Sequence, residues 1–108
     1  MSLYQIPLDP SGTLTQYDLT VDLGEISYVL TFRWSRLGQC WTLDVTTEDL
    51  DPIAQGVLLT PYIDLLQGAT HVNRPPGILT LVHANGGTDL PTIQTLGNAY
   101  NLYYSDPI

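Results

Sequence analysis

Ionisable side chains are the first candidates for chemistry in this sequence, and most of them are acids. The 108 residues include eleven aspartates and glutamates but only three arginines and no lysine. A glycosidase needs two carboxylates about 5–10 Å apart in a cleft, and the spacing of these acids selects no such pair. Asp18 and Asp22 fall on the polar side of one expected strand, where we expect both carboxylates to be solvated.

The other reactive side chains form no pattern typical of a metal centre or an activated nucleophile. His71 and His83 are far apart in the sequence, and each is expected to be hydrogen-bonded locally. The acidic segment 48–51 lacks the glycine and the closing glutamate of a calcium-binding loop, so we interpret it as a turn. Cys40 is the single cysteine, which rules out an internal disulfide and predicts a buried or half-buried inert thiol. We therefore expect no cofactor, no metal and no enzymatic activity.

The three arginines stand out because the rest of the chain is acidic. Arg33 and Arg36 flank the end of one expected strand, and Arg74 lies in a proline-rich loop. An arginine can bind a partner's carboxylate through two parallel hydrogen bonds. It can equally form an ion pair within the chain, for which Asp44 on the neighbouring strand is available. Arg33, Arg36 and Arg74 are thus candidate partner-contact residues, with the internal pair as the open alternative.

Charge and hydropathy exclude several classes of partner. A formal net charge of -8 with three basic residues cannot neutralise many phosphates, so we expect neither specific nucleic-acid binding nor binding to an anionic membrane surface. No run of about 18 apolar residues could span a membrane. The first residues carry no basic and apolar segment typical of a signal peptide, so we expect synthesis in a reducing cytoplasm.

Alternation of apolar and polar residues, which is typical of half-buried strands, gives the clearest structural signal. The expected strands cover residues 17–23, 28–35, 41–46, 53–59, 78–82 and 98–104. The first three are joined by short segments that contain glycine, which predicts two successive hairpins, and Gly56 predicts a bulge or bend. The predicted class is all-β: a single-domain antiparallel β-sandwich or barrel over residues 1–108. A loose N-terminal arm (1–12) and a loose C-terminal end (105–108) are expected.

Trp34 and Trp41 lie on the apolar sides of neighbouring expected strands and allow two interpretations. Both can be core residues, or they can form an aromatic platform for a ligand such as a carbohydrate, together with exposed tyrosines. A carbohydrate-binding β domain is therefore the alternative function. Burial of both tryptophans inside the domain would remove that platform.

Several short segments, taken in order, resemble one family of phage proteins. They are Gln5-Ile6-Pro7-Leu8 and residues 17–24, 28–35, 41–45, 51–59, 64–66, 76–79 and 96–104. Their order and spacing resemble the small baseplate plug proteins of contractile-tailed bacteriophages, including that of a cyanophage. The resemblance covers nearly the whole chain.

This resemblance implies a structural function without catalytic residues. Such proteins lie on the tail axis of the virion, contact the baseplate hub and spike proteins, and help to seal the tail tube before contraction. The resemblance also implies a homo-oligomer, and the position beside a three-fold spike suggests a trimer.

Overall fold

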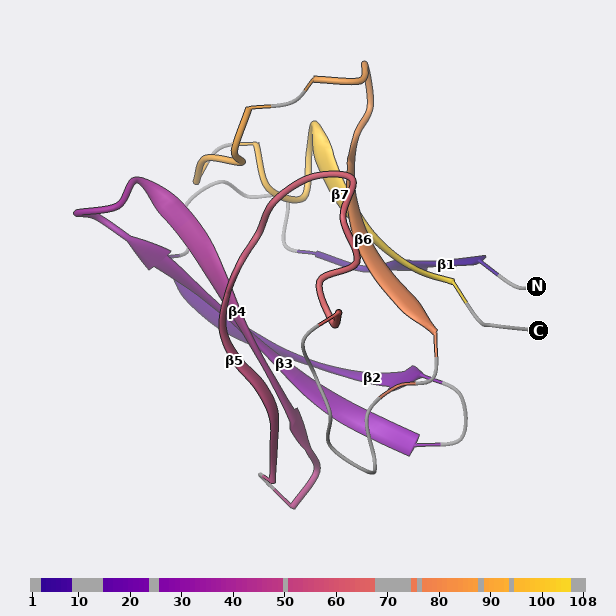
Figure 1. The fold of residues 1–108 in the computed structure, drawn as a ribbon. Coiled ribbons are helices and arrows are strands. Elements are labelled where there is room, and N and C mark those ends of the chain that lie inside the picture. The colour runs from indigo at the N-terminus through magenta and orange to yellow at the C-terminus, as the bar shows by residue number, and fades with distance from the viewer. Residues whose placement is uncertain are drawn as a thin grey trace.

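The chain folds into two antiparallel sheets around one core (Figure 1). The computed structural model describes residues 3–8, 15–23, 26–49, 51–67, 75, 77–87, 89–93 and 95–105. The strands are β1 (Leu3–Ile6), β2 (Gln16–Leu23), β3 (Ile26–Ser35), β4 (Cys40–Thr47), β5 (Pro52–Leu58), β6 (Ile78–His83) and β7 (Tyr100–Ser105). The small sheet has the order β1-β7-β6 and the large sheet β2-β3-β4-β5. No helix occurs among the described residues, so the predicted all-β class is confirmed.

The large sheet is the predicted meander. Strands β2, β3 and β4 pair in sequence order, with Tyr17 opposite Phe32 and Trp34 opposite Trp41. Alternate residues of β3 and β4 point into the core because side chains change face at every position along a strand. The fully buried residues on this inner face are Tyr28, Leu30, Phe32, Trp41, Leu43 and Val45. The outer face carries Asp18 and Asp22, which are exposed as expected.

Strand β5 pairs with β4 irregularly, as the glycine within it predicted. Gly56 has a φ of 63°, and the register shifts on either side of Val45. Glycine adopts a positive φ without steric cost. Together with the register shifts, this conformation marks a β-bulge, where one backbone N–H leaves the hydrogen-bond ladder. The bulge and Pro52 at the start of β5 make this edge of the sheet a poor template for a further strand.

The segment from 59 to 66 connects the two sheets. Leu59 N–H still donates to the Trp41 carbonyl at 3.0 Å, which extends the edge of the large sheet. Tyr62 N–H then donates to the Leu81 carbonyl at 2.9 Å and Leu65 N–H to the Leu79 carbonyl at 2.8 Å. The chain thus leaves one sheet and covers the β6 edge of the other, which closes one side of the sandwich (Figure 1).

Strand β1 departs from the predicted loose arm. Leu3 to Ile6 pair with β7, with Tyr4 opposite Tyr104 and Ile6 buried. The reason is that Ile6 contributes to the core while its backbone completes the β7 ladder. Ser105 is likewise paired, opposite both Leu3 and Ile78, whereas residues 106–108 lie outside the described residues.

The burial of Tyr28 leads us to expect a loss of stability at alkaline pH. Burial raises the pKa of Tyr28 above its ordinary value of 10.0, and the nearby Tyr104 acts in the same direction. The unfolded chain therefore loses this proton first as pH rises through about 10, so the free energy of unfolding falls there. We expect Tyr28→Phe to reduce the fall seen in urea titrations between about pH 8.5 and pH 10.5. An equal fall in variant and wild type would contradict this.

Candidate functional site

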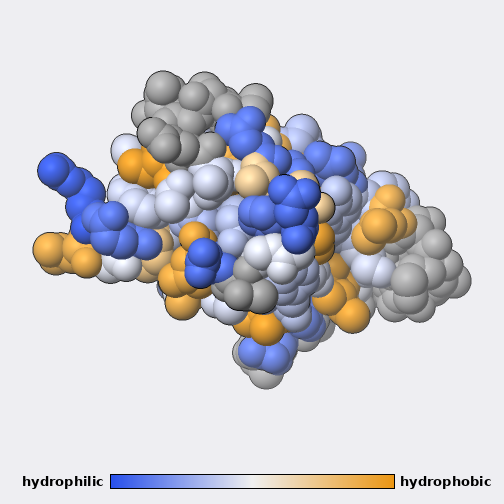
Figure 2. Space-filling view, turned by 90° about the horizontal axis from the view of Figure 1, so that it is seen from above, coloured by the Kyte–Doolittle hydropathy of each residue, from blue (hydrophilic) through white to orange (hydrophobic). Residues whose placement is uncertain are grey.

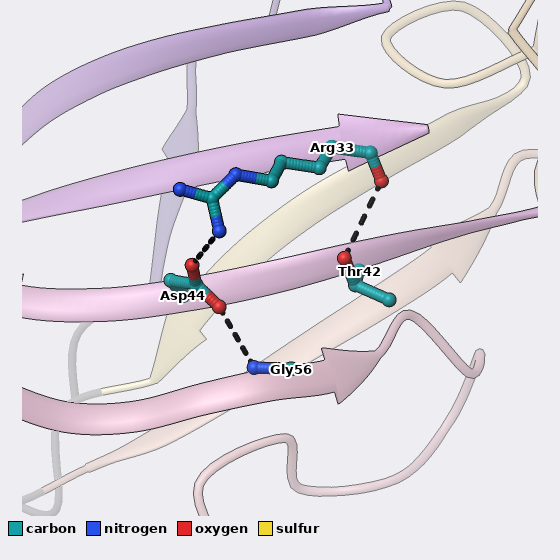
Figure 3. Close-up of polar contacts among 4 residues, drawn as sticks. All are labelled: Arg33, Thr42, Asp44 and Gly56. Carbon is teal, nitrogen blue, oxygen red and sulfur yellow. Dashed lines mark hydrogen bonds and ion pairs between the residues drawn. The ribbon is translucent and has the colours of Figure 1, made fainter. Parts of the chain in front are cut away.

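Arg33 is paired within the chain. Its guanidinium forms an ion pair with Asp44 on β4, and the other Asp44 oxygen accepts a 2.7 Å hydrogen bond from Gly56 N–H on β5 (Figure 3). Asp44 therefore satisfies the backbone N–H that faces it from the β5 bulge. The Asp44 side chain is 14% exposed and that of Arg33 54%. Of the two roles open to Arg33, the internal pair is thus observed.

This arrangement predicts unequal costs for removing its two charged members. Asp44→Ala leaves Gly56 N–H without its acceptor, and a hydrogen bond to a charged group contributes about 2 kcal/mol. Arg33→Ala removes only a largely exposed partner and is expected to cost less than about 1 kcal/mol. Urea denaturation followed by circular dichroism measures both free energies of unfolding. Equal costs would contradict the role assigned to Asp44.

The turn between β3 and β4 projects from one end of the molecule in a fixed conformation. Gly38 N–H donates to Ser35 Oγ at 3.1 Å, and Gln39 Nε2 donates to the Arg36 carbonyl at 2.7 Å. Leu37 is fully exposed, at 102%. This hairpin reaches the left end of Figure 1, where Figure 2 shows a hydrophilic and a hydrophobic projection side by side. An apolar and a polar group therefore stand together at this end.

Beside this turn lies an open groove of about 840 Å³, here called the hairpin groove. It is lined by Thr15, Trp34, Arg36, Leu37, Gln39 and Ile93. Arg36 is the one side chain of these six that is charged at neutral pH, and no ion pair of Arg36 is found within the described part of the chain. The groove is therefore a locally cationic site on an acidic molecule.

The two tryptophans have different environments. Trp41 is 1% exposed, its Nε1–H donates to the Thr92 carbonyl at 3.0 Å, and it is a core residue. Trp34 is half-buried, contacts Trp41 edge to face with ring centroids 5.7 Å apart, and also lines the hairpin groove. A carbohydrate platform built from both tryptophans is therefore incompatible with the structure, which leaves Trp34 alone at the surface.

The outer face of the small sheet holds a second groove, of about 440 Å³, here called the small-sheet groove. Its lining residues are Leu3, Ile78, Thr80, Val82, Tyr103 and Ser105, none of which carries a charge at neutral pH. Leu3 is 67% and Ile78 48% exposed. In a chain of net charge -8, this is a charge-free apolar surface.

Among the described residues, the remaining candidates do not come together in a reactive centre. His83 packs edge to face on Tyr100, and its Nδ1 accepts from Asn85 N–H at 3.0 Å, which confirms the expected local bonding. Cys40 is a half-buried free thiol, also as expected. Arg74 and His71 lie outside the described residues. Where the structure is described, no group of three or more His, Cys, Asp or Glu side chains could hold a metal.

The structure also adds surface residues that the sequence pattern did not select. Leu37 and Ile93 were not distinguished from other apolar residues, because a turn leucine has no periodic signal and Ile93 lies in an irregular segment. The one available signal was the leucine between Arg36 and Gly38 in a hairpin turn.

In the described part of the chain, no helix is long and apolar enough to cross a lipid bilayer.

Residues 3–107 match the family model described as the cyanophage baseplate Pam3 plug gp18. A search of curated proteins found no match. The matched region spans both sheets and both grooves, and the predicted resemblance is thereby confirmed. The chain belongs to the family of cyanophage baseplate plug proteins.

Proposed function

We propose that this chain is an axial plug of a contractile-tail baseplate, made in the host cytoplasm and held by protein–protein contacts with the hub and spike. The family supports a structural role in the baseplate of the virion. The observation that carries the finer proposal is the placement of exposed apolar groups on two surfaces with little or no negative charge. Such surfaces suit burial against other proteins, because no carboxylate has to be desolvated.

The plug acts without chemical turnover. The family to which the chain belongs is a structural component of the baseplate, which supports this part of the proposal. The acidic excess has a different use: a net charge of -8 lowers the affinity of the plug for the DNA that must pass it.

The plug is also a homo-oligomer, a trimer in our proposal, associated through the small-sheet groove. Two molecules of net charge -8 repel each other, and the repulsion is least where the contacting surfaces are uncharged. Leu3, Ile78 and Tyr103 offer apolar area for such a contact. Glutamate at position 78 would place a charge in this contact.

Two measurements test these statements. Mass spectrometry and cryo-electron microscopy of purified tails are expected to find the wild-type chain on the tail axis against the hub and spike, and its absence there would overturn the plug proposal.

Sedimentation equilibrium of the purified chain is expected to give a trimer that Ile78→Glu weakens by about tenfold or more. Leu58→Glu on the large sheet, where Leu58 is 41% exposed, is the matched control. A wild-type monomer would overturn the oligomer proposal.

A further inference from the structure

The β3–β4 turn exposes the apolar side chain of Leu37 to water, which is energetically unfavourable for the molecule on its own. Leu37 is fully exposed, although burial of a leucine side chain is favourable through loss of apolar surface to water. The side chain also stands on a turn that is already ordered by the Gly38–Ser35 and Gln39–Arg36 hydrogen bonds. Binding of a partner over Leu37 therefore orders little additional backbone in the turn. The entropic cost of binding is correspondingly small, which favours association.

The charges near the turn distinguish Arg36 from Arg33. The Arg33 guanidinium is occupied by Asp44, whereas Arg36 is exposed and has no ion pair among the residues described. A guanidinium matches a carboxylate in bidentate geometry. None of the six lining residues of the hairpin groove, all of them described, is an acid, so a molecule that fills the groove can supply a carboxylate to Arg36.

The composition of the groove also points to a protein as the occupant. Tryptophan and arginine are the residues most enriched among those that dominate protein–protein binding energy, and Trp34 and Arg36 lie together here with Leu37 and Ile93. A second copy of this chain is strongly acidic, and its proposed contact uses the uncharged small-sheet groove, where the repulsion between copies is least. A different protein with a local acidic and apolar segment is the better match.

We propose that the hairpin groove binds an acidic, apolar-containing segment of a neighbouring baseplate protein. A carboxylate of that segment pairs with the Arg36 guanidinium, and an apolar side chain beside it packs against Leu37 and Trp34. This inference rests on the proposed function, because it assumes that the chain is held in the baseplate by protein contacts.

The test is incorporation of variants into tails. Tails are purified from cells that produce the other baseplate proteins of the same phage with the wild-type chain or one variant, and the chain is quantified by mass spectrometry. We expect Arg36→Gln and Leu37→Ser each to reduce incorporation by about tenfold or more, and Arg36→Glu to reduce it further. Arg33→Gln removes the same charge from the internally paired arginine and is expected to stay within about twofold of wild type.

The outcomes separate this inference from the proposed function. Absence of the wild-type chain from tails overturns the proposed function and this inference with it. Normal incorporation of wild type, Arg36→Glu and Leu37→Ser leaves the plug proposal standing and overturns the assignment of the groove. Thermal melting by circular dichroism has to show wild-type stability for the variants, as expected for exposed positions.

A second arm identifies the occupant. A photo-crosslinking analogue of leucine at position 37, which keeps the apolar side chain, is expected to link the chain to a different baseplate protein, next to an aspartate or glutamate. A crosslink only between copies of this chain would overturn the assignment. So would saturable quenching of tryptophan fluorescence by a neutral oligosaccharide that Arg36→Gln leaves unchanged, because it would assign Trp34 to a sugar.

Discussion

Replacement of Trp41 by alanine is expected to lower the free energy of unfolding by about 3–5 kcal/mol. The indole is 1% exposed and lies between Trp34, at 5.7 Å, and Tyr17, at 6.0 Å between ring centroids. Its removal opens a cavity that strands β3 and β4 cannot collapse to fill, because both are held in register on either side. It also leaves the Thr92 carbonyl without the Nε1–H donor.

Two matched variants separate these contributions. Trp41→Phe keeps much of the ring area and is expected to cost about 1–3 kcal/mol, from the lost hydrogen bond to Thr92 and from the volume that the smaller ring leaves unfilled. Trp34→Ala removes a half-buried ring and is expected to cost less than Trp41→Ala. Urea unfolding followed by far-ultraviolet circular dichroism measures all three. A cost below about 1 kcal/mol for Trp41→Ala would show that the core is not organised around this residue.

Replacement of Gly77 by alanine is expected to destabilise the small sheet by about 3 kcal/mol, at the upper end of the usual cost of overpacking. A Cβ at this position would overlap the Ser105 carbonyl oxygen and would lie 2.8 Å from both Cζ and Oη of Tyr104. The first of these atoms belongs to the backbone and cannot rotate away. The Gly77 N–H also donates to Tyr104 Oη at 2.8 Å in a buried position, so any shift disturbs this hydrogen bond.

Gly86→Ala is the control for this prediction. Gly86 has a φ of 78°, but a Cβ there meets nothing within 4 Å. Its expected cost is therefore only the strain of a left-handed alanine, about 1–2 kcal/mol. Tyr104→Phe tests the hydrogen bond separately and is expected to cost about 1–3 kcal/mol. Equal melting temperatures for Gly77→Ala and wild type would contradict the close packing of Gly77 on β7.

The strands that the sequence predicts best are those with one solvent-exposed face and one buried face. Strands β2, β3 and β4 alternate over eight to ten residues, and this length makes period-two patterning unambiguous. Strand β1 has only four residues, which is too short for a periodic signal. Its formation depends on β7, whose position relative to the N-terminal segment is a property of the whole fold.

The candidate partner-contact residues illustrate a different limit. Arg33 and Arg36 have the same chemistry and lie three positions apart, so the sequence could not say which would pair with Asp44. The structure distinguishes them because Arg33 lies opposite Thr42 within the sheet, next to Asp44, whereas Arg36 lies beyond the end of β3 in the turn. The hairpin groove was equally hidden, since Thr15, Trp34 and Ile93 come from three separate parts of the chain.

The pairing of β1 with β7 also orders events during synthesis. Gln5 and Asn101, whose side chains are hydrogen-bonded, are 96 positions apart. At about 5–20 residues per second, a ribosome needs several seconds to deliver the second after the first. During this time the meander of β2, β3 and β4 leaves the ribosome and can fold from local contacts. Leu3 and Tyr4 stay unpaired in the nascent chain until their partner strand β7 has been made. The small-sheet groove therefore comes into existence last, so self-association through it would begin only once each subunit has been fully translated through β7.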